Sequence, residues 1–372
     1  MAIELLKKLI RAESTAEVGE LAVAKIIRDE LESCRIDAKI DVWNETRANL
    51  ICRIPSAGRR AGLLFACHLD VVPANPIFWK HSPFEPKQTA GRIFGRGSAD
   101  MKGGITAVIF AIRKIIDSGV RLKGELIFFG AAGEESDSCG AKRFIRNQAG
   151  TLPELAGIVI PEPTNFEVVT AHRGMLWLDI STHGISAHGS TPHLGINAIS
   201  SMRKVQEQLD TLKFSTRAHE LLGEPSLSIN TIEGGKAINI VPDNCRIGVD
   251  IRTLPGQNHQ EIVLDIQSML SRLKKEDSNF SFDISISREV PALETDNHSI
   301  FVKDFCSAVG VSETGAVCFT TDGPHFGPLG LPVVVFGPGN PELCHKPDEY
   351  IELSDIEKGA EYYRKLILKF LS

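Results

Sequence analysis

The chain has 372 residues, of which 42% are hydrophobic and 24% charged, as in an ordinary globular protein. Its formal net charge of −6 argues against a protein that binds nucleic-acid phosphates, because such proteins normally carry a basic face. No stretch approaches the roughly 20 apolar residues of a membrane-spanning helix. The length exceeds what one hydrophobic core usually serves, so we expect two domains.

The N-terminus and the cysteines indicate a cytoplasmic protein. Residues 1–14 lack the basic-then-apolar order of a signal peptide and have the spacing of an amphipathic helix. The 8 cysteines are scattered and form no C-x-x-C pair, so we expect no Cys-ligated zinc site. Several lie inside apolar runs, where a free cysteine behaves as a small hydrophobe, and this usage suits a reducing compartment.

Residues 1–173 and 288–372 alternate short apolar runs with helical stretches, and we assign them to one domain. The apolar runs are continuous rather than alternating, which is typical of strands buried on both faces of a largely parallel sheet. A helix is predicted over 105–116, with Gly119 at its C-terminal end. The four clearest apolar runs are Leu63–Cys67, Glu125–Gly130, Ala156–Ile160 and Leu331–Gly337.

Residues 174–287 have a different pattern, with strands that alternate apolar and polar residues. The predicted order is β-α-β-β-α-β, the ferredoxin-like split βαβ unit, with both helices on one face of a half-buried sheet. We therefore predict an α/β protein in which a domain with a mostly parallel core sheet and flanking helices is interrupted by an inserted lid domain. The predicted elements of the lid are 175–181, 199–212, 226–232, 245–252, 259–274 and 280–286.

Each of the four apolar runs is followed within a few residues by a side chain that can bind a metal ion. In open α/β sheets, ligands bind at the carboxyl ends of the strands, so these side chains are expected to meet at one edge. The loop 95–104 adds Asp100 just before the predicted helix. In chain order, the four runs lead to His68 and Asp70, to Glu134 and Glu135, to Glu162, and to His345.

Two of these motifs contain residue pairs whose members can take different roles. Residues two apart in an extended segment project to the same side, so Asp70 could orient the ring of His68. Of Glu134 and Glu135, one could bind metal while the other acts as a general base. The structural alternative for the first pair is that His68 is a buried histidine followed by a turn aspartate. For the second pair it is that Glu134 and Glu135 lie on a solvated acidic loop.

The remaining acids and the histidine complete a metal-ligand set without thiolates. Asp100 could instead cap the following helix, Glu162 could be a turn residue, and His345 could be a surface histidine. Taken together, a mixed histidine and carboxylate set suits Zn²⁺, with Co²⁺ or Mn²⁺ as substitutes. The set exceeds the needs of one tetrahedral ion, and a shared carboxylate between two ions about 3.5–4 Å apart would use it fully.

In combination, these motifs resemble the M20 family of metallopeptidases and deacylases, in particular the acetylornithine deacetylase and succinyl-diaminopimelate desuccinylase branch. The resemblance extends over nearly the whole chain. It implies that His68, Asp100 and Glu162 hold one ion and that Asp100, Glu135 and His345 hold the other. It also implies that Asp70 orients His68, that Glu134 is the general base, and that the Asp100–Met101 peptide is cis. The matching segments are 68–70, 95–104, 133–135, 162 and 344–350.

The resemblance further implies roles outside the metal cluster. His188 matches a lid histidine that stabilises the tetrahedral oxyanion, often in the partner subunit of a homodimer. Arg252, Asn239 and Gly323 match positions that contact the substrate. From the residues alone, His188 could equally be a loop histidine, and Arg252 could be a solvated strand residue.

The function implied is removal of an acetyl or succinyl group from an N-acyl amino acid, as in amino-acid biosynthesis, with Glu134 activating a bridging water. The alternatives are an M20 dipeptidase or carboxypeptidase, a general aminoacylase, and a metal-binding protein without catalysis. A serine hydrolase is disfavoured because residues 184–188 miss the last glycine of G-x-S-x-G. A nucleotide-binding loop at 119–125 is disfavoured because Glu125 stands where the motif needs lysine.

Overall fold

The computed structural model describes residues 2–372, and the chain divides into two compact units. The larger unit comprises the chain up to Thr170 together with Glu294–Gly315 and Thr321–Ser372. The inserted unit comprises Ala171–Leu293 and Ala316–Thr320, and it contains the segment 174–287 that was assigned to a lid.

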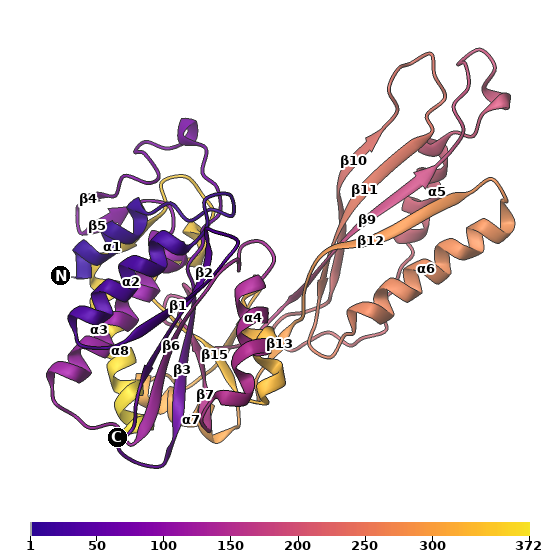
Figure 1. The fold of residues 1–372 in the computed structure, drawn as a ribbon. Coiled ribbons are helices and arrows are strands. Elements are labelled where there is room, and N and C mark those ends of the chain that lie inside the picture. Colours follow the sequence, from indigo (N-terminus) through magenta and orange to yellow (C-terminus); the bar gives the residue numbers. More distant parts are fainter. Residues whose placement is uncertain (1) are drawn as a thin grey trace. The chain divides into compact units, whose positions relative to one another are not determined.

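The main sheet has the strand order β1-β2-β6-β3-β7-β15-β8-β13 (Figure 1). Strand β3 pairs in parallel with both β6 and β7, and β7 pairs in parallel with β15. These four strands are the apolar runs of the sequence, and their side chains are almost all buried, which confirms the expected parallel core. The strands are β1 (Ala38–Trp43), β2 (Arg47–Ile54), β3 (Arg60–His68), β6 (Gly124–Ala131), β7 (Leu155–Ile160), β8 (Val169–His172), β13 (Leu293–Glu294), β14 (Gly315–Val317) and β15 (Val333–Val335).

Helices cover this sheet, and α3 is the predicted helix at 105–116. Most of its residues are apolar and buried by the neighbouring elements. The helix ends at Asp117, two residues before Gly119, whose φ is +69°. Its first residues, Gly103 and Gly104, allow a close approach: a Cβ on Gly104 would lie 2.2 Å from the carbonyl oxygen of Pro161. The helices are α1 (Ala2–Arg11), α2 (Leu21–Ser33), α3 (Gly103–Asp117), α4 (Cys139–Gln148), α7 (Ile300–Val309) and α8 (Leu353–Leu371).

A small antiparallel sheet lies beside the start of α3. Strand β5 (Arg92–Phe94) pairs with β4 (Lys87–Thr89) on one side and with β16 (Tyr350–Glu352) on the other. This pairing brings the segment before α8 next to the loop 95–102, which includes the irregular helical turn η2 (Ser98–Lys102). Short 3₁₀ turns occur at η1 (Pro76–Phe78), η3 (Ala149–Thr151), η5 (Gly323–Leu329) and η6 (Pro341–Leu343).

The inserted unit is an antiparallel sheet of order β10-β11-β9-β12 with α5 and α6 on one face (Figure 1). Alternate side chains of β9, among them Leu178 and Ile180, pack with Met202 of α5 and Ile266 of α6. The split βαβ prediction is confirmed. The elements are β9 (Gly174–His183), η4 (Pro192–Leu194), α5 (Ala198–Leu209), β10 (Ser226–Gly234), β11 (Asn244–Thr253), α6 (His259–Glu276) and β12 (Ser281–Val290).

Within residues 2–372, no helix combines the length and the apolar character needed to cross a membrane. The cysteines at all eight positions are free thiols.

Candidate active site

The parallel strands deliver the predicted ligands to one edge of the main sheet. Strand β3 ends at His68, β6 ends three residues before Glu134, and β7 ends two residues before Glu162. The loop after β15 carries His345. Parallel strands have their carboxyl ends on the same side, which explains why residues far apart in sequence meet here.

Five of the predicted residues form a continuous series of contacts. Nε2 of His68 lies 3.0 Å from one carboxylate oxygen of Asp100 and 3.4 Å from Oε1 of Glu162. The other oxygen of Asp100 lies 3.3 Å from Nε2 of His345, which is 3.0 Å from Oε1 of Glu135. Asp100 is therefore shared between two groups of ligands, each with one histidine. It does not cap α3, whose N-cap residue is Lys102, and the Asp100–Met101 peptide is cis, as the resemblance implied.

Asp70 contacts both His68 and the loop that carries the two glutamates. Nδ1 of His68 lies 3.0 Å from the main-chain oxygen of Asp70, closer than the 3.6 Å to the carboxylate. The carboxylate accepts hydrogen bonds from the backbone N–H groups of Gly133, Glu134 and Glu135 at 3.0–3.1 Å. Sequence reasoning anticipated the contact with the ring, but not that the main chain would make the shorter contact or that the carboxylate would hold residues 133–135.

The carboxylates of this cluster are buried together, which favours a bound cation. Burial raises the pKa of Glu162 to about 8 and, together with the Asp100 carboxylate, raises the pKa of Glu135. A divalent ion would offset this cost, because it supplies positive charge where the carboxylates are desolvated. His68, Asp100 and Glu135 each offer a ligand atom within 4.8 Å of the others. Imidazole and carboxylate ligands without thiolate fit Zn²⁺ and similar ions.

The two histidines of the cluster interact with its carboxylates. Hydrogen bonds to Asp100 and Glu135 raise the pKa of His345 to about 10. For His68, burial acts to lower the pKa, but the Glu162 and Asp100 carboxylates outweigh it and raise the pKa well above its usual value. Because metal binding needs neutral imidazole, an ion entering this cluster would displace protons from both rings.

Glu134 is buried beside these ligands, with 8% of its surface exposed. Burial, with added repulsion from the Glu135 and Asp322 carboxylates, raises its pKa well above the usual value. A carboxylate with a raised pKa is a better proton acceptor near neutral pH than an ordinary glutamate. Its location and environment suit a general base.

The candidate residues of the inserted unit have a different environment. His188 is exposed, and its Nδ1 lies 2.7 Å from Oγ of Ser190. Asn239 is exposed too, and its main-chain oxygen accepts a 2.7 Å hydrogen bond from the N–H of Gly189. The structure therefore brings His188 and Asn239 to neighbouring segments.

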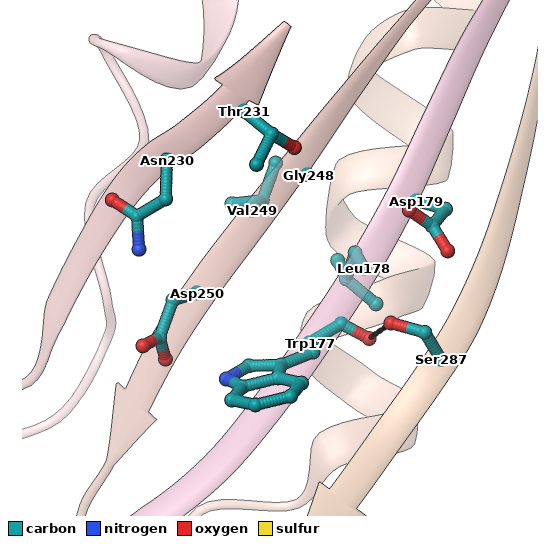
Figure 2. Close-up of a pocket in the computed structure, with 9 residues that line it drawn as sticks. All are labelled: Trp177, Leu178, Asp179, Asn230, Thr231, Gly248, Val249, Asp250 and Ser287. Atoms are coloured by element: carbon teal, nitrogen blue, oxygen red, sulfur yellow. Dashed lines mark hydrogen bonds between the residues drawn. The ribbon is translucent and has the colours of Figure 1, made fainter. Parts of the chain in front are cut away.

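Arg252 lies on β11 and is paired with a carboxylate on the same strand. Its Nε lies 3.0 Å from Oδ1 of Asp250, and its Nη2 donates to Oδ2 at 3.0 Å. Figure 2 shows Asp250 and Trp177, which are opposite each other on adjacent strands, at a shallow cavity of about 280 Å³. The last predicted substrate residue, Gly323, belongs to the larger unit, where its N–H donates to Oγ1 of Thr321 at 3.0 Å.

Sequence reasoning missed two buried acids near the cluster. Glu349 is fully buried and accepts hydrogen bonds from the N–H groups of Ala99 and Asp100. Asp322 is 6% exposed, and burial raises its pKa to about 7. Glu349 lies within the matching segment 344–350 and Asp322 directly precedes Gly323, and those positions were the available signal.

Comparisons with known proteins place this geometry in a known context. The chain is 30% identical to an acetylornithine deacetylase of Buchnera aphidicola subsp. Schizaphis graminum (strain Sg), over 89% of this chain and 87% of the relative. It is 28% identical to a probable succinyl-diaminopimelate desuccinylase of Staphylococcus aureus (strain MSSA476), over 99% and 97%. A solved M20 family metallo-carboxypeptidase from Sulfolobus solfataricus has the same fold, with a TM-score of 0.83, 19% identity, and coverage of 99% of this chain and 98% of that chain.

The model of peptidase family M20/M25/M40 matches residues 64–369. This range begins within β3, before His68, and extends through the inserted unit and His345 into α8. The chain belongs to peptidase family M20/M25/M40 and is a hydrolase of that family, as its motifs indicated.

Proposed function

We propose that this hydrolase is a metal-dependent deacylase that removes an acetyl or succinyl group from the nitrogen of a small amino acid. The observation that supports this most strongly is the series of contacts from Glu162 through His68, Asp100 and His345 to Glu135. Two sets of ligands sharing one carboxylate suit two ions, with the buried Glu134 beside them.

In this proposal His68, Asp100 and Glu162 hold one divalent ion, and Asp100, Glu135 and His345 hold the second. Zn²⁺ is the expected metal, with Co²⁺ or Mn²⁺ as substitutes. When bound, the ions would supply Lewis-acid chemistry, lowering the pKa of a water molecule and polarising an amide carbonyl. The hydrogen bond from Nδ1 of His68 to the Asp70 main chain would fix the tautomer in which Nε2 faces the metal.

Glu134 then serves as the proton carrier. It takes a proton from the attacking water and passes it to the leaving amine, so one carboxyl group acts first as base and then as acid. Asp70 supports this role, because its carboxylate holds the backbone N–H of Glu134. His188 is proposed to donate a hydrogen bond to the oxyanion, from this chain or from a partner subunit.

The substrate class is inferred from the relatives and from residues that could contact a carboxylate. Acetylornithine deacetylase and succinyl-diaminopimelate desuccinylase are the names of the curated relatives. Arg252 would bind the α-carboxylate of the substrate through its guanidinium, with Asn239 and Gly323 as further contacts. A role in amino-acid biosynthesis follows from the same proposal.

A homodimer is also proposed, formed through the inserted unit. This unit has a surface hollow of about 590 Å³ whose lining includes Ile199, Ile238 and Ile240. All three isoleucines are exposed, and a concentration of exposed apolar side chains often marks a protein interface. Light scattering of the wild-type chain and of Ile238→Asp tests this: a dimer in both, or a monomer in both, would refute the role of this surface.

The free cysteines support a cytoplasmic location, because exposed thiols such as that of Cys318 persist in reducing compartments. This is tested by measuring the amount of the protein in the cytoplasmic and extracellular fractions of its source cells.

The deciding experiment combines metal analysis with a substrate panel on one preparation. N-acetylornithine, N-succinyl-diaminopimelate, a general N-acyl amino acid and a dipeptide are assayed for released amine, before and after chelation and after addition of Zn²⁺. We expect about two ions per chain and metal-dependent release from one of the first two substrates. Preference for the dipeptide would establish the peptidase alternative. Metal binding with no turnover of any substrate would favour the non-catalytic one.

A further inference from the structure

Glu349 connects two loops that each carry a metal-ligand candidate. One of its carboxylate oxygens accepts hydrogen bonds from the N–H groups of Ala99 and Asp100, at 2.9 and 3.1 Å. The other accepts from Nη1 of Arg96 at 2.6 Å. Glu349 is 0% exposed and Arg96 is 3% exposed. The carboxylate is thus held by three donors, all from the loop that leads into Asp100.

The same residue lies only four positions after His345. Its main-chain oxygen accepts a hydrogen bond from the N–H of Gly95 at 2.9 Å, and strand pairing of Tyr350 with Phe94 follows directly. The segment around His345 has little regular structure, and His345 itself has φ of +63°. A non-glycine residue in this region is held there by its surroundings. Glu349 is the residue that joins this segment to the Asp100 loop from within the interior.

The hydrogen bonds to Glu349 fix the direction of the Asp100 side chain as well as the distance between the two loops. Two consecutive N–H groups that point at one oxygen set the orientation of the peptide before Asp100, and hence the direction of the Asp100 side chain. The guanidinium of Arg96 also lies over the ring of Trp79, 5.1 Å from the ring centre. Arg96 is therefore held by its own packing as well as by the carboxylate.

We infer that Glu349 is a positioning residue for the ion proposed to lie between Asp100, Glu135 and His345. This inference rests on the proposed dinuclear site. Two of the three ligands of that ion come from the loops that Glu349 joins, whereas the ion proposed at His68 and Glu162 takes only Asp100 from them. A substitution of Glu349 should therefore weaken binding of the ion at Glu135 and His345 more than binding of the ion at His68 and Glu162.

Two conservative variants separate the length of the side chain from its charge. Glu349→Asp keeps the charge opposite Arg96 but withdraws the oxygen from the two N–H groups by one methylene. Glu349→Gln keeps the length and one accepting oxygen but loses the charge. Glu352→Asp is the matched control, because Glu352 lies on the same segment and pairs with Arg92 at 2.6 Å on the surface.

The readout is Co²⁺ titration of the metal-free chain, followed by visible absorption and by metal analysis after gel filtration. We expect two binding steps in the wild type and in Glu352→Asp. In Glu349→Asp one of the two steps should lose about 10–100-fold in affinity, the usual effect of changing a residue behind a metal ligand. The other step should change much less, and the affinities of Glu349→Gln should lie nearer to the wild type than those of Glu349→Asp.

Each outcome decides the matter. Wild-type steps in a folded Glu349→Asp, or an equal loss of both steps, overturn the inference. Should Glu349→Asp fail to fold by circular dichroism, Glu349→Gln decides alone: a loss of affinity in one step supports the inference, and two wild-type steps or an equal loss in both overturn it. Fewer than two ions in the wild type would instead refute the dinuclear site, so the two failures are distinguishable.

Discussion

The metal-ligand candidates of the larger unit and the substrate-contact candidates of the inserted unit are organised in opposite ways. Among the metal-ligand candidates, His68 and Glu162 are buried, Asp100 and Glu135 are half-buried and His345 is exposed, and contacts join all five into one series. His188 and Asn239 are exposed: His188 contacts Ser190 in its own loop, and the main-chain oxygen of Asn239 accepts a hydrogen bond from Gly189. The metal-ligand candidates are therefore held in place by contacts with one another, whereas the side chains of His188 and Asn239 are open to solvent.

The physical basis of the contrast is where each group of residues stands in its sheet. Parallel strands buried on both faces bring their ends to one edge, where turns such as the one before Glu134 are held by buried acceptors like Asp70. The antiparallel sheet of the inserted unit buries one face only, so residues on its other face and in its loops remain accessible. Under the proposed function, chemistry that needs desolvation takes place in the first region and substrate recognition in the second.

The largest expected effect comes from Glu134→Gln, which removes the base while keeping the size of the side chain. Turnover should fall by about a thousandfold, within the range of general acid–base catalysis, while the metal content stays unchanged. Deacylase assays with metal analysis on the same sample measure both. Glu85→Gln, an exposed residue of the same unit, is the control. Substantial turnover in Glu134→Gln would remove this residue from the mechanism.

The next effect tests the inserted unit. Replacement of His188 by Ala should lower kcat about 100-fold and leave KM and bound metal nearly unchanged, because an oxyanion donor acts in the transition state. His193→Ala, a neighbouring exposed histidine, should behave as the wild type. Steady-state kinetics separate kcat from KM. An equal kcat in the His188 and His193 variants would end the proposed role.

A smaller effect is expected for Arg252→Lys, which keeps the charge but loses the planar fork that binds carboxylates. KM for an N-acyl amino acid should rise about tenfold, or about 1.4 kcal/mol, with kcat little changed. The same variant should barely affect a substrate analogue in which the α-carboxylate is an amide. Arg246→Lys, on the same strand and paired with Asp179 at 2.7 Å, is the control. Equal increases for both substrates would contradict a carboxylate contact.

The last prediction concerns stability and contrasts a buried histidine of the inserted unit with the exposed His188. Burial lowers the pKa of His172 to about 4. The unfolded chain therefore binds the proton first as pH falls, so this stability is present above about pH 6.5 and is lost towards pH 4. Denaturant unfolding should show a slope up to about 1.4 kcal/mol per pH unit that His172→Gln lacks. Parallel pH curves for the wild type and His172→Gln would contradict it, and His188→Ala should keep the wild-type slope.

Much of the site could be predicted because strand ends are visible as the ends of apolar runs. His68 and Glu162 follow directly from that pattern, since each stands at or just after the end of a buried parallel strand. The partners of Asp70, Arg252 and Glu349 could not be predicted in this way. They depend on which backbone groups face a side chain after turns and strands have packed, and neither spacing nor residue type reveals that.

The sequence by itself determined the fold class, the split βαβ insertion and the set of residues that meet at the sheet edge, because periodicity and strand ends are local properties of the chain. Only the tertiary structure decided that Asp70 holds the N–H groups of residues 133–135 and that Asp100 is shared between His68 and His345. It also decided that Glu349 joins the two loops from inside. Hydrogen bonds act over about 3 Å, so they depend on packing that brings together residues hundreds of positions apart.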